Sequence, residues 1–278
     1  QGQEVFCPKL VFTHRCPVYG YGKILVHYRM NQLQHRRFIM NEKIRQLKEI
    51  IDGTDNLVFF GGAGVSTESG IPDFRSTDGL YSMKYDYPPE TIVSHTFFMR
   101  RNKEFYEFYK DKMMALDAKP NAAHYKLAEW EKQGKCRAVI TQNIDGLHQM
   151  AGSKNVLELH GSIHRNYCMS CGKFFDAAYV KNSEGQPKCD ECGGLIKPDV
   201  VLYEEGLDQR VISKTVQYIS QADVLIIGGT SLVVYPAAGL IDYFKGSHLI
   251  LINKSKTERD SQADLIINDK IGEVFKQL

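Results

Sequence analysis

The segment that most limits the fold of this chain is "LVFFGGAGVSTESGIPDFR", residues 57–75. Its apolar start, Leu57–Phe60, has the character of a buried strand, and the glycines that follow allow a tight turn that can approach a phosphate closely. The glycine spacing differs from the G-x-G-x-x-G of dinucleotide-binding dehydrogenases. The segment therefore predicts a nucleotide-binding turn after a strand, in a protein that is not a typical dehydrogenase.

Segments with strand and helix character alternate along the rest of the chain. Residues 121–134, "NAAHYKLAEWEKQG", predict a helix that begins after Asn121 and ends at Gly134. The other predicted strands are CRAVITQN, VLELHGS, DVLIIGG, HLILIN and ADLII, and the other predicted helices include VISKTVQYISQ and YPAAGLIDYFKG. This alternation predicts an α/β fold with a doubly wound, Rossmann-like parallel sheet.

Two segments do not fit the alternation and predict a smaller inserted module. The stretch Thr91–Ala115 is rich in aromatic residues at helical spacing, which we expect to form core. The second segment carries four of the seven cysteines in the pattern C-x2-C-x17-C-x2-C: Cys168, Cys171, Cys189 and Cys192. This spacing suits one tetrahedral Zn²⁺ of structural type. The alternatives are two disulfides or four incidental thiols.

Polar side chains follow several predicted strands, where α/β proteins place their ligands. One group is "TQNIDGLH" at residues 141–148, another is "GGTSLVVYPA" at residues 228–237, and His160 lies beyond a short strand. Together with the first glycine turn they offer a phosphate cradle, an amide, a carboxylate, an imidazole and a second anion site. The pattern predicts an enzyme site.

These motifs, in this order, resemble those of the sirtuins of bacterial type, which are NAD-dependent protein-lysine deacylases. The resemblance rests on GAGxSxxSGIPDFR, TQNIDGLH, HG, the two C-x2-C pairs, GTSL and LIN, and it extends over residues 41–278. It implies a catalytic domain at residues 40–278, with the Rossmann-like core at 40–76, 120–164 and 198–278. The helical insert would then be 77–119 and the zinc module 165–197.

The resemblance also implies which residues contact NAD. The first turn would receive the pyrophosphate, Phe74 and Arg75 would close over the nicotinamide ribose, and Asp145 would hold the carboxamide. The full implied set is Ala63, Gly64, Thr67, Phe74, Arg75, Gln142, Asn143, Ile144, Asp145, His160, Gly229, Thr230, Ser231, Asn253 and Asp269.

The reaction implied by the resemblance consumes NAD instead of transferring a hydride. The acyl-lysine carbonyl oxygen attacks C1′ of the ribose as nicotinamide leaves, and His160 acts as general base on the ribose hydroxyls. Asn143 and Asp145 complete the catalytic group. Hydrolysis then yields free lysine and 2′-O-acetyl-ADP-ribose. The substrate, an acetylated protein or peptide, would add as a strand beside Val201 and Tyr203.

The acyl group is predicted to be acetyl or another neutral group. Sirtuins that remove succinyl groups carry Tyr-x-x-Arg in the helical insert, whereas this chain has Tyr109-x-x-Lys112. Lysine lacks the planar fork with which arginine binds a carboxylate. Other neutral acyl groups, or mono-ADP-ribosyl transfer on the same scaffold, are the alternatives.

The first 39 residues differ from the rest, because they are basic, carry Glu4 as their single acid and lack sustained periodicity. We expect Met40 to be the natural start and residues 1–39 to lie outside the domain; a mitochondrial targeting peptide is the alternative. The net charge of +2 favours neither nucleic acid nor membrane as partner. Cysteines that remain free thiols fit a reducing compartment, so we expect this protein in the cytoplasm.

Two other classes of protein compete with this interpretation. A dinucleotide oxidoreductase would need G-x-G-x-x-G and an acid about 20 residues later, and neither occurs in that form. A zinc-ribbon binding module would leave His160 and the Asn143–Asp145 group unexplained. Acyl-ADP-ribose among the products would separate deacylation from both.

Overall fold

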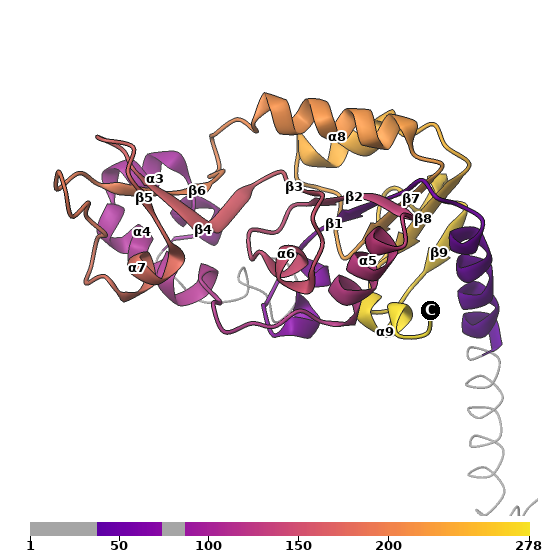
Figure 1. Ribbon diagram of the computed structural model, residues 1–278. Coiled ribbons are helices and arrows are strands. Elements are labelled where there is room, and N and C mark those ends of the chain that lie inside the picture. Colours follow the sequence, from indigo (N-terminus) through magenta and orange to yellow (C-terminus); the bar gives the residue numbers. More distant parts are fainter. Residues whose placement is uncertain (1–37, 74–86) are drawn as a thin grey trace, which may run out of the picture. The chain divides into compact units, whose positions relative to one another are not determined.

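The computed structural model describes residues 38–73 and 87–278 (Figure 1). Residues 43–278 form a compact unit, and both β-sheets found among the described residues belong to it. A helix covers residues 38–52 of the described chain. No helix within the described residues is long and apolar enough to span a bilayer.

A six-stranded parallel sheet forms the centre of the larger lobe, with strand order β3-β2-β1-β7-β8-β9. Its strands are β1 (Leu57–Gly61), β2 (Cys136–Thr141), β3 (Val156–Glu158), β7 (Val224–Gly228), β8 (His248–Ile252) and β9 (Leu265–Ile267). The chain moves outward from β1 through β2 to β3 and later returns to the other side of β1 as β7. The carboxyl ends of β1 and β7 therefore form the switch point where such sheets bind ligands.

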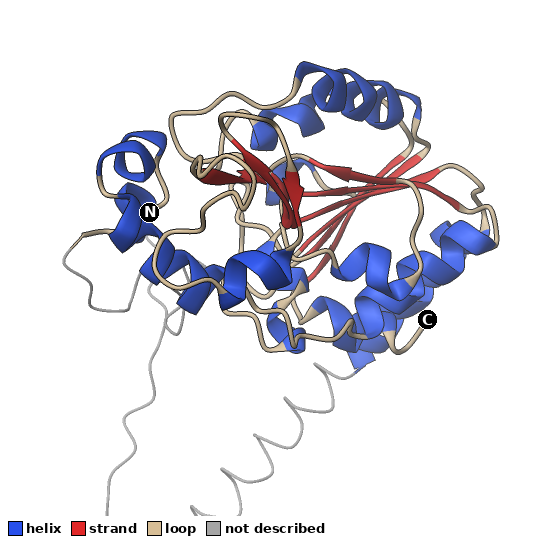
Figure 2. Cartoon of the chain, turned by 60° about the vertical axis from the view of Figure 1, so that its left-hand side comes forward, coloured by secondary structure: helices blue, strands red, loops and turns tan. Residues whose placement is uncertain are grey.

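Helices cover both faces of this sheet, as Figure 2 shows. Figure 1 places α8 (Gln209–Gln221) on one face and α5 (Ala122–Lys132) with α9 (Ile271–Phe275) on the other. Helix α6 (Leu147–Ala151) follows β2, and short 3-10 helices η1 (Ala63–Val65) and η2 (Thr67–Ser69) follow β1. The predicted doubly wound fold is confirmed.

One predicted helix has a different form. Residues 235–246 were expected to be α-helical, but the structure has a 3-10 helix, η5, at Ala237–Tyr243. The segment is short, lies between Pro236 and Gly246, and contains Gly239, which lowers helix propensity. Few residues are therefore available for i→i+4 hydrogen bonds.

The smaller lobe combines a three-stranded antiparallel sheet with short helices. The strand order is β5-β4-β6, with β4 at Gly161–Cys168, β5 at Phe174–Phe175 and β6 at Ile196–Val200. The helices are α2 (Pro89–Ile92), α3 (His95–Arg100), α4 (Asn102–Phe108) with a π turn at Tyr109–Met113, and α7 (Ala177–Asn182). This sheet extends at both ends beyond the predicted zinc module of 165–197.

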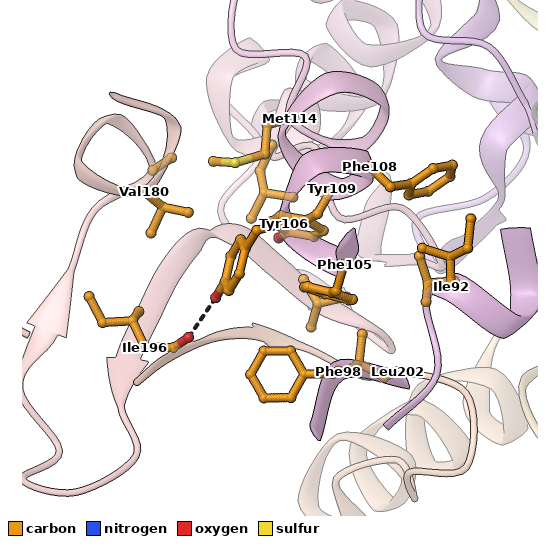
Figure 3. Packing of buried hydrophobic residues seen from close by; sticks show 14 of the residues in the cluster. Ile92, Phe98, Phe105, Tyr106, Phe108, Tyr109, Met114, Val180, Ile196 and Leu202 are labelled. Atoms are coloured by element: carbon orange, nitrogen blue, oxygen red, sulfur yellow. Dashed lines mark hydrogen bonds between the residues drawn. The ribbon is translucent and has the colours of Figure 1, made fainter. Parts of the chain in front are cut away.

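The aromatic residues of α4 and the strands of the small sheet share one core (Figure 3). Phe98, Phe105, Tyr106 and Tyr109 are fully buried, which confirms that these rings form core. The Tyr106 hydroxyl donates a hydrogen bond of 2.5 Å to the Ile196 carbonyl of β6. The helical insert and the cysteine-bearing segment are therefore one packed lobe.

Candidate active site

Two glycine-rich loops meet at the switch point of the sheet. The Gly64 amide donates to the Gly229 carbonyl at 2.7 Å, and the Gly62 amide donates to the Gly228 carbonyl at 3.2 Å. A Cβ atom on Gly64 would lie 2.7 Å from the Gly229 Cα, and Gly229 has φ +59°. Only glycine therefore permits this approach of the two loops.

The Gly64 amide, which the resemblance assigns to the pyrophosphate, donates to the Gly229 carbonyl in this structure. Ala63 opens η1 and is half-buried, and Thr67 is exposed with its hydroxyl donating to the Gly64 carbonyl at 3.0 Å. Phe74 and Arg75 lie outside the described residues.

The polar turn after β2 is joined to the first loop by side chains. The Ser66 hydroxyl donates to Asp145 Oδ2 at 2.6 Å and accepts from Asn143 Nδ2 at 3.0 Å. Asp145 Oδ1 accepts from the Leu147 amide at 2.9 Å, at the start of α6. The carboxylate is therefore held through both oxygens, and it lies beside the amide of Asn143.

His160 lies between β3 and β4, and its ring is oriented by the polar turn. Its Nδ1 lies 2.9 Å from the Gln142 carbonyl, while the Gln142 amide donates to the Gly61 carbonyl at 2.9 Å. A carbonyl only accepts, so Nδ1 carries the proton and Nε2 keeps its lone pair. Burial lowers the pKa of His160, and the Gln142 hydrogen bond partly opposes this shift. The neutral imidazole is a competent base.

Two of the residues expected to bind the adenosine half of NAD, Thr230 and Asn253, lie in contact. Thr230 Oγ1 accepts from Gln142 Nε2 at 3.2 Å, and the Thr230 carbonyl accepts from Asn253 Nδ2 at 3.2 Å. Ser231 is exposed next to them. Asp269 is half-buried beyond β9, where its carboxylate accepts from the Lys270 amide.

Two side chains near this site, Ser66 and His164, were not predicted from the sequence, and Ile144 makes a further contact. Ile144 packs against the core of the smaller lobe. Ser66 was not singled out, although it belongs to the GAGVS motif and links Asn143 to Asp145. His164 was also missed; its Nε2 lies 2.9 Å from the Asp145 carbonyl. No local pattern marks His164, because the contact joins a turn to a strand.

The four predicted cysteines form a compact cluster at the far end of β4. Their Sγ atoms all lie within 4.8 Å of one another. Cys168 and Cys192 are 3.4 Å apart at Sγ, and Cys171 and Cys189 are 3.6 Å apart. These separations exceed a disulfide bond of about 2.05 Å. They fit thiolates around one tetrahedral Zn²⁺, for which Zn–S bonds of about 2.3 Å place the sulfurs roughly 3.8 Å apart.

Comparisons with known proteins agree in family and fold. The model of the Sir2 family matches residues 62–236. A protein of Clostridium acetobutylicum, named NAD-dependent protein deacetylase, is 65% identical over 241 residues, which are 86% of this chain and 98% of the relative. A solved structure of a Sir2 variant with a deacetylated p53 peptide and 3′-O-acetyl ADP-ribose matches with TM-score 0.79 and 39% identity, covering 84% of this chain and 96% of that one. A structure of Sir2 with a p53 peptide and NAD⁺ matches over the same shares, with TM-score 0.75 and 39% identity.

Proposed function

This chain belongs to the Sir2 family and is an NAD-dependent protein-lysine deacetylase, and we propose that His160 is the general base of its reaction. Bound NAD would supply the ADP-ribose part that receives the acetyl group, with nicotinamide released and one water consumed, so the products are deacetylated lysine, nicotinamide and 2′-O-acetyl-ADP-ribose. The substrates are acetyl-lysine proteins or peptides and NAD.

The hydrogen bond from His160 Nδ1 to the Gln142 carbonyl carries this proposal. It fixes the tautomer in which Nε2 can take a proton from a ribose hydroxyl. The same Gln142 residue donates through its amide to β1 and through its side chain to Thr230. The base is thus oriented by the residue that connects both glycine-rich loops of the NAD site.

We assign Asp145 and Asn143 to the nicotinamide end of the site. The Asp145 carboxylate is fixed by Ser66 and by the Leu147 amide, so it needs little reorganisation to accept a carboxamide N–H. Gln142 and Ile144 complete the nicotinamide end, and Phe74 and Arg75 would close over the nicotinamide ribose. Ala63, Gly64 and Thr67 form the proposed pyrophosphate turn, and the residues of the adenosine half are Gly229, Thr230, Ser231, Asn253 and Asp269.

His160→Ala tests the assignment of the base. Deacetylation of an acetylated peptide should fall by roughly 10²–10⁴-fold, the usual contribution of general-base catalysis. NAD affinity, measured by calorimetry, should change little, because the base acts on an already bound ribose. His248→Ala is a control that removes a half-buried imidazole at the start of β8, outside the proposed site. A His160→Ala enzyme with more than about a tenth of wild-type activity would contradict the role.

The four clustered cysteines would hold one structural Zn²⁺. Cys168 and Cys189 are buried in the core of the smaller lobe, where the ion would tie β4 to the segment before β6. The four thiolates fill a tetrahedral site and leave no position for a substrate. The metal therefore acts on folding, while the NAD chemistry uses the residues around His160.

We propose that the catalytic domain begins at about Met40 and that residues 1–39 lie outside it. Residues 43–278 form a compact unit of their own, which supports this boundary. Within the domain, the core would be 40–76, 120–164 and 198–278, with the inserts 77–119 and 165–197. A chain that starts at Met40 should be expressed in soluble form and turn over like the full chain; loss of either property would contradict the boundary.

We also propose a cytoplasmic location. The cysteines that the structure describes form no disulfide, which is consistent with a reducing compartment. Fractionation of cells that express the full chain, followed by immunodetection, tests this location. Recovery in a membrane or organelle fraction would contradict it.

A further inference from the structure

The turn after β6 contains a strained residue at the edge of the proposed substrate site. Residues Leu202–Glu205 form a turn in which the Glu205 amide donates to the Leu202 carbonyl at 3.0 Å. Glu204, the third residue of this turn, has φ +77°. Turns with positive φ at this position strongly favour glycine, because a Cβ atom is unfavourable there. Within the described residues, Leu232 is the only other non-glycine residue with positive φ.

The Glu204 carboxylate caps a helix of the smaller lobe. Its Oε2 accepts from the Thr96 amide at 2.8 Å, in the first turn of α3. This amide is one of those that a helix leaves without an internal partner. The neighbouring Phe97 amide is capped by Ser94 Oγ at 3.2 Å. The hydrogen bond from Thr96 holds the pKa of Glu204 below its ordinary value, so the cap is ionised at neutral pH.

The side chain of the next residue, Glu205, stabilises the turn. Its Oε2 accepts from the Leu202 amide at 2.9 Å and pairs with Lys197 Nζ at 3.1 Å, and its Oε1 lies 2.8 Å from His95 Nδ1. The two successive carboxylates therefore have separate tasks. Glu205 stabilises the turn, whereas Glu204 connects the turn to α3.

The backbone before the turn lies between His160 and α3. The Val201 amide donates to the His160 carbonyl at 3.0 Å. Two residues later, the Tyr203 amide donates to the Val93 carbonyl and the His95 amide donates to the Tyr203 carbonyl, both at 3.0 Å. The Val201 carbonyl accepts no hydrogen bond from any residue that the structure describes. It is thus an available acceptor for a peptide that adds as a strand.

We propose that Glu204 is a positioning residue for the acyl-peptide: its bond to the Thr96 amide holds the segment Val201–Tyr203 at the position from which it pairs with the substrate backbone. This inference rests on the proposed function. A glycine at position 204 would relieve the backbone strain but would leave Thr96 without its acceptor. Glutamate at position 204 makes the turn less favourable than glycine would. In return, its hydrogen bond to Thr96 fixes the distance between α3 and the segment Val201–Tyr203.

A second role for Glu204 makes a different prediction. An exposed carboxylate beside the peptide site would select basic residues next to the target lysine. In the structure, however, this carboxylate is engaged by the Thr96 amide. The positioning role changes the affinity for all peptides alike, whereas the selecting role changes the ratio between basic and acidic peptides.

Three variants of Glu204 separate these roles. Glu204→Gln keeps an oxygen that can accept from Thr96, Glu204→Gly removes both the cap and the strain, and Glu204→Asn tolerates positive φ but is one methylene too short. Steady-state kinetics would be measured with one acetyl-peptide flanked by arginine and one flanked by aspartate. Asp176→Ala is the matched control, because Asp176 caps α7 of the same lobe through the Tyr179 amide at 2.8 Å.

The positioning role predicts a specific pattern. Glu204→Gly and Glu204→Asn should raise KM for both peptides by roughly three- to tenfold, the loss expected for one helix cap. KM for NAD should stay within about twofold of the wild-type value, since the segment Val201–Tyr203 lies beside the peptide and not beside the dinucleotide. Glu204→Gln should stay near wild type, and Glu204→Gly should unfold at the wild-type temperature or above it. Asp176→Ala should lose stability without a change in peptide KM.

Other results would overturn the inference. If KM for the peptides stayed at the wild-type value in both Glu204→Gly and Glu204→Asn, the cap would not position the segment Val201–Tyr203. A change in the ratio between the two peptides in Glu204→Gln would assign the residue to peptide selection instead. A wild-type chain without NAD-dependent deacetylation would contradict the proposed function itself, which keeps the two failures distinct.

Discussion

The Ser66 hydroxyl donates a hydrogen bond of 2.6 Å to Asp145 Oδ2 and so joins the glycine-rich turn after β1 to the polar turn after β2. Ser66 is only 1% exposed, and Asn143 donates to the same hydroxyl. A single side chain thus orients both the carboxylate and the amide proposed for the nicotinamide end of the site.

Ser66→Ala should therefore weaken the use of NAD. A hydrogen bond to a charged group contributes about 1.5–3 kcal/mol, so kcat/KM for NAD should fall by roughly 10- to 100-fold. Ser213→Ala is a matched control, because Ser213 lies exposed on α8 and donates only to the Gln209 carbonyl. Unchanged kcat/KM for NAD in Ser66→Ala would show that Asp145 does not depend on this bond.

Two buried histidines behind the same site should make the fold sensitive to acid. The rings of His124 (α5) and His148 (α6) have centroids 4.7 Å apart, and neither residue is more than 1% exposed. His124 Nδ1 accepts from the Asn121 amide, while His124 Nε2 and both nitrogens of His148 have no partner among the described residues. Burial lowers the pKa of His124 to about 4, although the nearby Asp145 opposes the shift. Burial and the neighbouring His124 hold the pKa of His148 well below its ordinary value.

The sign of the pH dependence follows from these directions. Below pH 6.5 the unfolded chain binds protons that the folded chain does not, so the free energy of unfolding decreases as the pH falls from 6.5 towards 4. Each such histidine contributes a slope of up to about 1.4 kcal/mol per pH unit. His160 contributes in the same direction, since burial lowers its pKa as well.

Chemical denaturation between pH 7.5 and 5 measures this slope. His148→Leu should reduce it by about one histidine's share, whereas His248→Gln, which removes a half-buried histidine outside the pair, should leave the contribution of the pair in place. Zinc would be held constant in all samples, so that any metal loss cancels between variants. Equal slopes in wild type and His148→Leu would contradict the buried neutral pair.

Local patterns predicted much of this structure, and the reason differs from element to element. The cap at Asn121 was predictable because it depends on neighbours two or three residues away. The zinc cysteines were predictable because metal geometry restricts their spacing. The parallel sheet was accessible through the alternation of strands and helices, which nearly requires that arrangement.

The parts that the sequence did not reveal depend on contacts between distant segments. The hydrogen bond from the Gly64 amide to the Gly229 carbonyl joins turns that follow two different strands of the sheet. The cap that Glu204 places on α3 joins residues 108 positions apart. The 3-10 form of residues 237–243 differs from an α-helix by a small shift in hydrogen bonding, which a short segment does not encode strongly.

Loss of zinc should lower stability and activity together. Cys168 and Cys189 belong to the core of the smaller lobe, along with Phe175, Val180 and Ile196. Without the metal, the cysteines of this core would no longer be held together, and the lobe would lose stability. Cys168→Ser or Cys189→Ser should lower the unfolding temperature, the zinc content and the turnover in parallel. Cys136→Ala, which changes a buried thiol of β2 outside the cluster, should keep its zinc. A cysteine variant with normal thermal stability but no turnover would assign the metal to catalysis.

The acyl pocket should prefer acetyl-lysine to succinyl-lysine by a large margin. Tyr109, the first member of the Tyr109-x-x-Lys112 pair, is fully buried with its ring stacked on Phe105. Its hydroxyl has no hydrogen-bond partner among the described residues. Lys112 Nζ lies 2.8 Å from Asp111 Oδ2, so a succinyl carboxylate would compete with an acid already present.

The size of this preference follows from desolvation. A buried carboxylate costs several kcal/mol unless it is paired and hydrogen-bonded, and lysine offers no planar fork to pair with it. An uncompensated cost of even about 2.7 kcal/mol would lower kcat/KM about a hundredfold. Competition between acetyl and succinyl forms of one peptide, followed by mass spectrometry, measures the ratio directly. A propionyl form is the control for size, since it adds a methylene without charge and should remain a substrate. Comparable kcat/KM for acetyl and succinyl peptides would mean that Lys112 serves in place of the arginine, and Lys112→Ala would then abolish only the succinyl activity.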